Sequence, residues 1–104
     1  MTNYYGKDIS LDEILLHVRP GWHPLIKTLV EDLEKLGWDG QVCQVKEKFG
    51  GLRFYIGAES DEIHLRINEA EKQSYKICEW CGEPGTLVKM GWWTTRCPEH
   101  EETD

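Results

Sequence analysis

Apolar residues recur at helical spacing in the N-terminal part of the chain. Ser10-Leu-Asp-Glu13 has the form of a capping box and predicts a short helix that ends before Arg19-Pro20-Gly21. A longer stripe then predicts a second helix from about residue 22, with Gly37 as its C-terminal stop. The apolar members of this stripe are Trp22, Leu25, Ile26, Leu29, Leu33 and Leu36. Two helices are therefore expected before residue 38.

The spacing changes to that of strands over residues 41–47 and 52–56. Leu52, Phe54 and Ile56 alternate with Arg53 and Tyr55, as in a strand with one buried face. Lys48-Phe-Gly-Gly51 separates the two segments, and we expect its paired glycines to supply the positive φ angles of a tight turn. This region predicts a β-hairpin.

A third helical stripe begins at about Asp61 and leads directly into Cys78. Its apolar face contains Ile63, Ile67, Ala70, Ser74 and Ile77. Leu65 falls outside that stripe, so the helix is expected either to be covered on two sides or to expose an apolar side chain.

The spacing of cysteine and histidine near the C-terminus is typical of a zinc site. Cys78-Glu-Trp-Cys81 is followed, after fifteen residues, by Cys97-Pro-Glu-His100. Two residues between paired ligands let one tight turn direct both side chains to the same point, and structural zinc takes four Cys or His ligands. We expect one structural Zn²⁺ per chain, held by Cys78, Cys81, Cys97 and His100.

The residues around these ligands predict a small module. Cys78-Glu-Trp-Cys81-Gly82 is typical of a zinc knuckle, and residues 86–89 and 92–95 predict two short strands that reverse near Met90-Gly91. Cys97-Pro98-Glu99-His100 suits the first turn of a terminal helix. This order is similar to a treble-clef finger or zinc ribbon. We therefore expect one α+β domain over residues 1–104, with a body over 1–77 and a zinc-binding module over 78–104.

Cys43 is the one cysteine outside this spacing. It could replace His100 in a four-cysteine site, although the spacing favours His100. We otherwise expect Cys43 to point inward beside Val45 as an inert buried thiol. A nucleophilic pair of Cys43 with His17, His23 or His64 has no spacing to support it, and no phosphate-binding glycine loop or paired-carboxylate motif is present. The sequence therefore favours a protein that is not an enzyme.

Composition narrows the class of partner. The 104 residues carry a formal net charge of −7 and 39% hydrophobic residues, which suits one small domain. Negative charge repels nucleic-acid phosphates, so nucleic-acid binding is disfavoured unless a local basic patch exists. No apolar run approaches the roughly 18 residues of a membrane helix, and the first ten residues lack a signal-peptide pattern. We expect a cytoplasmic protein, without a membrane partner.

Two candidate binding surfaces follow from the strand pattern and the tryptophan content. Lys46, Lys48, Arg53 and Tyr55 should share one hairpin face, which suits a phosphate or an acidic partner unless it is simply solvated. Trp80, together with Trp92 or Trp93, could form an exposed aromatic patch of the kind enriched at protein interfaces. The alternative is that these rings pack over the zinc ion.

Three segments resemble a group of small, largely uncharacterised proteins of bacterial genomes and tailed phages. They are residues 45–56 (VKEKFGGLRFYI), 77–85 (ICEWCGEPG) and 91–100 (GWWTTRCPEH), within a likeness that runs from about Gly21 to His100. The resemblance supports the three cysteines and His100 as a unit and implies an accessory role in a phage or prophage. It implies no enzymatic activity.

These observations favour a non-enzymatic, zinc-stabilised binding protein that engages a host or phage protein. Two alternatives remain open at this point. The first is a nucleic-acid-binding zinc finger, by analogy with other proteins of that fold. The second is a binder of, or an enzyme acting on, a nucleotide-like small molecule held by the basic hairpin face.

Overall fold

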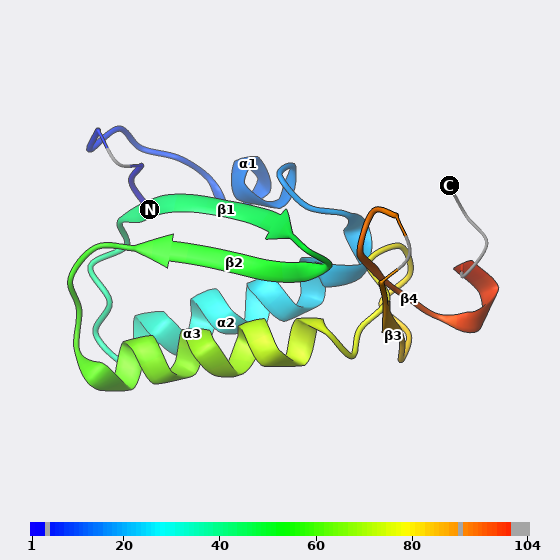
Figure 1. The fold of residues 1–104 in the computed structure, drawn as a ribbon. Helices are drawn as coiled ribbons and strands as arrows, with labels where there is room; N and C mark the ends of the chain where they lie inside the picture. Colours follow the sequence, from blue (N-terminus) through cyan, green and yellow to red (C-terminus); the bar gives the residue numbers. More distant parts are fainter. Residues whose placement is uncertain (4, 90, 101–104) are drawn as a thin grey trace.

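A computed structural model describes residues 1–3, 5–89 and 91–100 of the chain. The order of elements is α1 (Leu11–Leu15), η1 (Pro20–Trp22), α2 (His23–Lys35), β1 (Val42–Lys48), β2 (Gly51–Ile56), α3 (Asp61–Ser74), β3 (Thr86–Val88), β4 (Thr94–Arg96) and η2 (Pro98–His100). Figure 1 shows β1 and β2 over α2 and α3, with β3 and β4 beyond the turn of the hairpin. The expected mixture of helices and small antiparallel sheets is confirmed.

Ser10 and Gly37 mark helix ends as predicted, and Ser60 is a further cap. The Ser10 hydroxyl accepts a hydrogen bond from the backbone N–H of Glu13 at 3.2 Å, and Ser60 caps α3 in the same way. Gly37 ends the second helical segment with a φ of 91°. Leu65 projects from α3 with 66% of its surface exposed, so the exposed alternative for this residue is the one observed.

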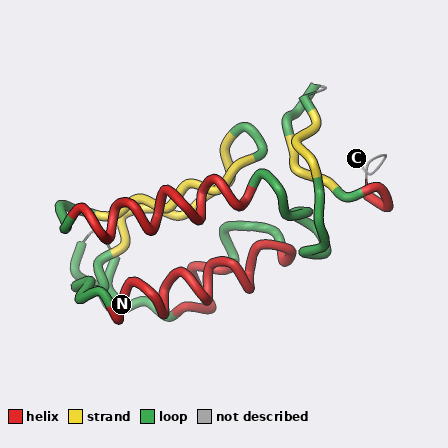
Figure 2. Tube along the Cα trace, turned by 90° about the horizontal axis from the view of Figure 1, so that it is seen from below, coloured by secondary structure: helices red, strands yellow, loops and turns green. Residues whose placement is uncertain are grey.

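The core lies between the hairpin and the two long helices, which run beside each other along one face of it (Figures 1 and 2). Its fully buried members include Trp22, Ile26, Leu29, Leu33, Leu52 and Ile63. Trp22 also donates from Nε1 to the carbonyl oxygen of Ile77 at 3.0 Å, which satisfies its polar atom. Trp38 lies in the same core, edge-on to Phe54.

The hairpin turn differs from the expected one. Lys48 pairs with Gly51, so Phe49 and Gly50 are the two central residues, with φ angles of 54° and 80°. Positive φ at both central residues matches the twist of the strands, as in a type I′ turn. The prediction that both glycines supply positive φ is therefore wrong for Gly51. Glycine is required there for another reason, because a Cβ atom would overlap the Tyr75 ring.

Helix α3 closes the outer edge of β2. The backbone N–H of Leu52 donates to Ser74 Oγ at 2.9 Å, and that of Phe54 donates to Glu71 Oε2 at 3.0 Å. Side chains of α3 thus satisfy donors that an edge strand otherwise leaves to solvent.

The C-terminal residues pair as β3 and β4 beside the hairpin turn, as both views show (Figures 1 and 2). The second predicted strand is shifted, since β4 begins at Thr94 and excludes Trp92 and Trp93. Trp92 and Trp93 are both exposed, whereas Thr94 and Thr95 are buried. Met90, at the predicted reversal, lies outside the described residues.

None of the described helices has the length and apolar character needed to cross a membrane.

Candidate metal centre and neighbouring surface

The four predicted ligands come from two local turns. Cys78 and Cys81 lie on a knuckle in which Gly82 has a φ of 81° and donates its N–H to the Cys78 carbonyl oxygen. Cys97 follows β4 directly, and His100 ends η2, where its N–H donates to the Cys97 carbonyl oxygen. Each turn brings two side chains to the same side, so the two pairs face each other.

The ligand atoms of these residues form one cluster. All four lie within 4.8 Å of one another. Sγ of Cys81 is 3.6 Å from Sγ of Cys97, and His100 Nδ1 is 3.0 Å from Sγ of Cys97 and 3.6 Å from that of Cys78. A tetrahedron with metal–sulfur bonds of about 2.3 Å separates its ligands by about 3.5 to 3.8 Å. The cluster therefore fits a metal ion of the kind that thiolates and imidazole bind.

The metal-free thiols differ in acidity. Burial alone would raise the pKa of Cys78, but the backbone N–H groups of Cys81, Cys97 and Trp80 outweigh it and lower the pKa to about 7. For Cys81 the Glu83 N–H acts to lower the pKa, but desolvation and the adjacent Cys97 and Cys78 thiols prevail and raise it to about 11. A thiolate thus forms at Cys78 before it forms at Cys81.

Glu79, between the first two ligands, connects three segments of the chain. Its side chain is fully buried, and its carboxylate accepts from Arg19 Nη1 at 3.0 Å and from the Thr95 N–H at 2.8 Å. Its backbone carbonyl accepts from the Gly21 N–H at 2.7 Å. Thr95 Oγ1 in turn donates to the Gly50 carbonyl oxygen at 2.7 Å. The knuckle is therefore bonded to the segment before α2, to β4 and, through Thr95, to the hairpin turn.

Burial raises the pKa of the Glu79 carboxyl, while the Thr95 N–H and the positive charge of Arg19 act in the opposite direction. The sequence does not single out Glu79. An acidic side chain between two cysteine ligands gives no local signal of burial, because its cation lies 60 residues earlier in the chain.

Trp80 packs beside the metal cluster instead of joining an exposed patch. Its ring stacks on the His100 ring at 6.2 Å between centroids and 10° between planes. The guanidinium carbon atoms of Arg19 and Arg96 lie 4.5 and 4.8 Å from its centroid. Trp80 therefore packs over the metal cluster, which is the second of the two predicted alternatives.

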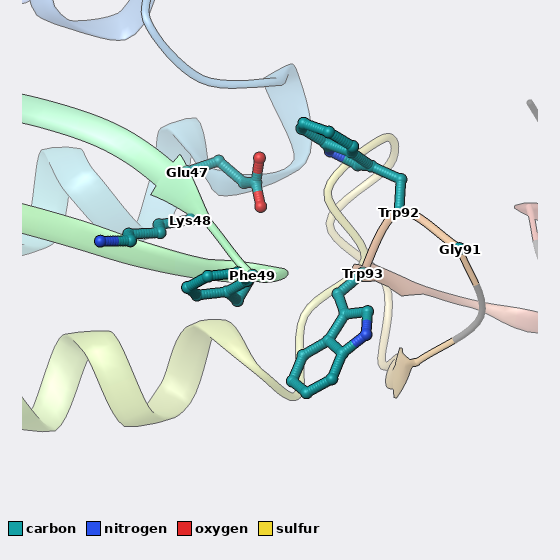
Figure 3. Close-up of a pocket in the computed structure, with 6 residues that line it drawn as sticks. All are labelled: Glu47, Lys48, Phe49, Gly91, Trp92 and Trp93. Atoms are coloured by element: carbon teal, nitrogen blue, oxygen red, sulfur yellow. The ribbon is translucent and has the colours of Figure 1, made fainter.

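Trp92 and Trp93 instead face the tip of the hairpin across a groove of about 580 Å³ (Figure 3). The Phe49 and Trp93 rings meet edge-on at 5.9 Å between centroids. Their exposed fractions are 77% for Trp92, 60% for Phe49 and 39% for Trp93. We call this surface, lined by Glu47, Lys48, Phe49, Gly91, Trp92 and Trp93, the aromatic groove. Phe49 was not among the predicted binding residues. The sequence signal for it was an aromatic residue at the tip of a predicted hairpin.

The predicted basic residues of the hairpin do share its outer face, because Lys46 pairs with Arg53 across the two strands. Their charges are engaged within the chain. Lys46 Nζ lies 5.9 Å from the Tyr55 ring centroid. Arg53 Nη2 donates to the Tyr75 hydroxyl at 3.1 Å, a bond that raises the pKa of Arg53.

Cys43 lies away from the metal cluster, so the four-cysteine alternative does not describe the site. A register shift between Val42 and Gln44 places it at an irregularity of β1, half-buried, instead of inward beside Val45 as expected. Cys43 and His17 line a cavity of about 210 Å³, but no hydrogen bond joins them among the described residues.

Comparison of the chain with protein-family models, with curated proteins and with solved structures gives no match.

Proposed function

We propose that this chain is a non-enzymatic binding protein in which one structural zinc ion stabilises a C-terminal module that carries part of a protein-binding surface. The observation that supports this most directly is the aromatic groove. Two distant segments bring Phe49, Trp92 and Trp93 together on the surface, where large apolar side chains are otherwise costly to expose.

Zinc is the metal that the donor set favours. Three thiolates and one imidazole are a common set for structural zinc, and four protein ligands leave no position at which a water molecule could be activated. The knuckle, the β3–β4 hairpin and the ligands around η2 have the order of a treble-clef finger. We therefore assign the metal a structural role in a treble-clef-like module.

A protein partner, from a phage or its host, fits the groove better than a nucleic acid does. Tryptophan side chains often carry much of the binding energy at protein interfaces, and Trp92 is largely exposed. The net charge of −7 acts against phosphate binding.

Affinity capture from bacterial lysate tests this proposal. The immobilised chain should retain one stoichiometric partner, and Trp92→Ala should abolish its retention. Leu65→Ala is the control, because it removes another largely exposed apolar side chain, which lies on α3 outside the groove. Capture that survives both Trp92→Ala and Phe49→Ala would show that the groove is not the binding surface.

A further inference from the structure

The aromatic groove contains an acceptor as well as apolar rings. The carboxylate of Glu47 points into the space between the hairpin and the two tryptophans, whereas the ammonium group of Lys48 points away from it (Figure 3). Glu47 Oε2 accepts a hydrogen bond from the Gly50 N–H at 2.7 Å. Its Oε1 atom accepts none from the part of the chain that the structure describes. One carboxylate oxygen is thus open to a ligand in the groove.

The rings of the groove already attract cations. Lys48 Nζ lies 5.6 Å from the Phe49 ring centroid, and Lys89 Nζ lies 5.1 Å from that of Trp93. The electron-rich face of an aromatic ring favours such positions. The Trp92 ring has no cation over it within the described ranges, and it is the most exposed of the three. Its faces are therefore open to a cation from outside the chain.

From this arrangement we propose that the aromatic groove binds the guanidinium group of an arginine on a basic segment of the partner protein. The inference rests on the proposed protein-binding function and specifies the chemistry of the partner. A guanidinium group is planar, stacks on aromatic rings and presents N–H donors in a fork that matches a carboxylate. The guanidinium plane can stack on Trp92, and Glu47 Oε1 can accept from its N–H donors.

The net charge of the chain favours arginine over guanine, which is a ligand with similar chemistry. A guanine base also stacks on aromatic rings and offers neighbouring N–H donors to a carboxylate, but it carries phosphate in nucleotides and nucleic acids. The chain has a net charge of −7, which attracts a basic peptide and repels phosphate. Lysine fits less well, because its ammonium group is a compact, strongly hydrated charge that does not stack.

Short peptides test the inference directly. The probes are acetyl-Gly-Arg-Gly-amide and its lysine and citrulline counterparts, with the zinc-loaded full-length protein observed by the NMR signals of the Trp92 and Trp93 indole N–H groups. The arginine peptide should shift both signals at millimolar concentration. It should bind about tenfold more tightly than the citrulline peptide, which has a similar shape but no charge.

Two variants distinguish the contribution of the Glu47 carboxylate to binding from that of the Trp92 ring. Glu47→Gln retains an oxygen for the Gly50 N–H but removes the charge, and it should weaken arginine-peptide binding about tenfold. Trp92→Ala should weaken it to a similar extent, whereas Leu65→Ala should leave it unchanged. Circular dichroism and zinc content should match the wild type in all three variants.

Several results would overturn the arginine assignment. Equal binding of the citrulline or lysine peptide would show that the groove does not recognise a guanidinium group, and unchanged binding by Glu47→Gln would exclude the carboxylate contact. Tighter binding of guanosine monophosphate, weakened by the same substitution, would identify a nucleotide site. If no arginine peptide binds while lysate capture still depends on Trp92, the arginine assignment fails and the protein-binding proposal stands.

Discussion

The guanidinium group of Arg19 lies 4.5 Å from the centroid of the Trp80 ring and also donates a hydrogen bond to the carboxylate of Glu79. Both partners belong to the knuckle between Cys78 and Cys81. One side chain from the segment before α2 thus contacts the metal module in two ways. The module and the helical body should therefore unfold together.

Glu79→Ala tests this connection. The substitution leaves the buried Thr95 N–H without its acceptor and separates Arg19 from its carboxylate, so it should lower the free energy of unfolding by about 2–3 kcal/mol. Urea denaturation followed by tryptophan fluorescence measures the change. Glu83→Ala is the control, because that side chain is exposed and should alter stability by no more than about 0.5 kcal/mol. Equal effects of the two substitutions would contradict the role given to Glu79.

Metal content distinguishes the four ligands from the remaining cysteine. Protein purified without chelator should contain about one zinc ion per chain, and strong chelation should lower its free energy of unfolding. Cys97→Ser should lose most of the metal, whereas Cys43→Ser should keep it, because Cys43 is not part of the cluster. Elemental analysis of the two variants provides the measurement. Metal lost from Cys43→Ser but retained by Cys97→Ser would disprove the ligand set.

Zinc binding should release protons at neutral pH. The metal binds thiolates, and in the metal-free protein the pKa of Cys81 is raised to about 11, so this thiol is protonated at pH 7. The pKa of Cys78 is about 7, so below that value its proton must also leave. Affinity should therefore rise with pH, and more steeply below pH 7 than above it. Calorimetry in buffers of different ionisation enthalpy counts the protons, and a release of none would refute the thiolate assignment.

Gly21 should tolerate no side chain. A Cβ atom there would overlap the carbonyl oxygen of Cys78 and disturb the 2.7 Å hydrogen bond from the Gly21 N–H to Glu79. Gly21→Ala should therefore cost about 1–3 kcal/mol. At Gly57 the nearest atom would be 3.5 Å from an added Cβ, so Gly57→Ala should change stability by about 0.5 kcal/mol or less. Thermal unfolding of the two variants makes the comparison.

Phe49 should contribute to binding more than to stability. Its φ of 54° lies in the left-handed region, which costs a non-glycine residue about 1–2 kcal/mol. Its edge-on contact with Trp93 stabilises the folded state by about 0.5–1.5 kcal/mol. Phe49→Gly should therefore change stability by less than about 1 kcal/mol, whereas Leu52→Ala in the core should cost about 2–5 kcal/mol. A comparable loss in both variants would show that Phe49 is a structural residue.

The sequence predicted the metal cluster because its geometry is local. Cys78 and Cys81 belong to one turn, and so do Cys97 and His100, so spacing alone brings each pair together. Helical periodicity likewise placed the three helices, and the Ser10 cap acts on the first turn that follows it.

The remaining features depend on contacts between distant segments. Trp93 meets Phe49 only because Thr95 holds β4 at the hairpin turn, and strand alternation carries no information about that contact. The φ of Phe49 was missed for a related reason. Gly51 pairs with Lys48 as the first residue of β2, so the positive φ angles fall on Phe49 and Gly50 instead of on the two glycines.

The contact of α3 with the hairpin also limits how partners can bind. Ser74 and Glu71 occupy the outward N–H groups of Leu52 and Phe54, so the central part of the β2 edge offers no free donors there to an extended peptide. Strand addition and edge-to-edge aggregation both require such donors. A partner at this edge would have to engage side chains, and the hairpin can remain short and two-stranded without polymerising through β2.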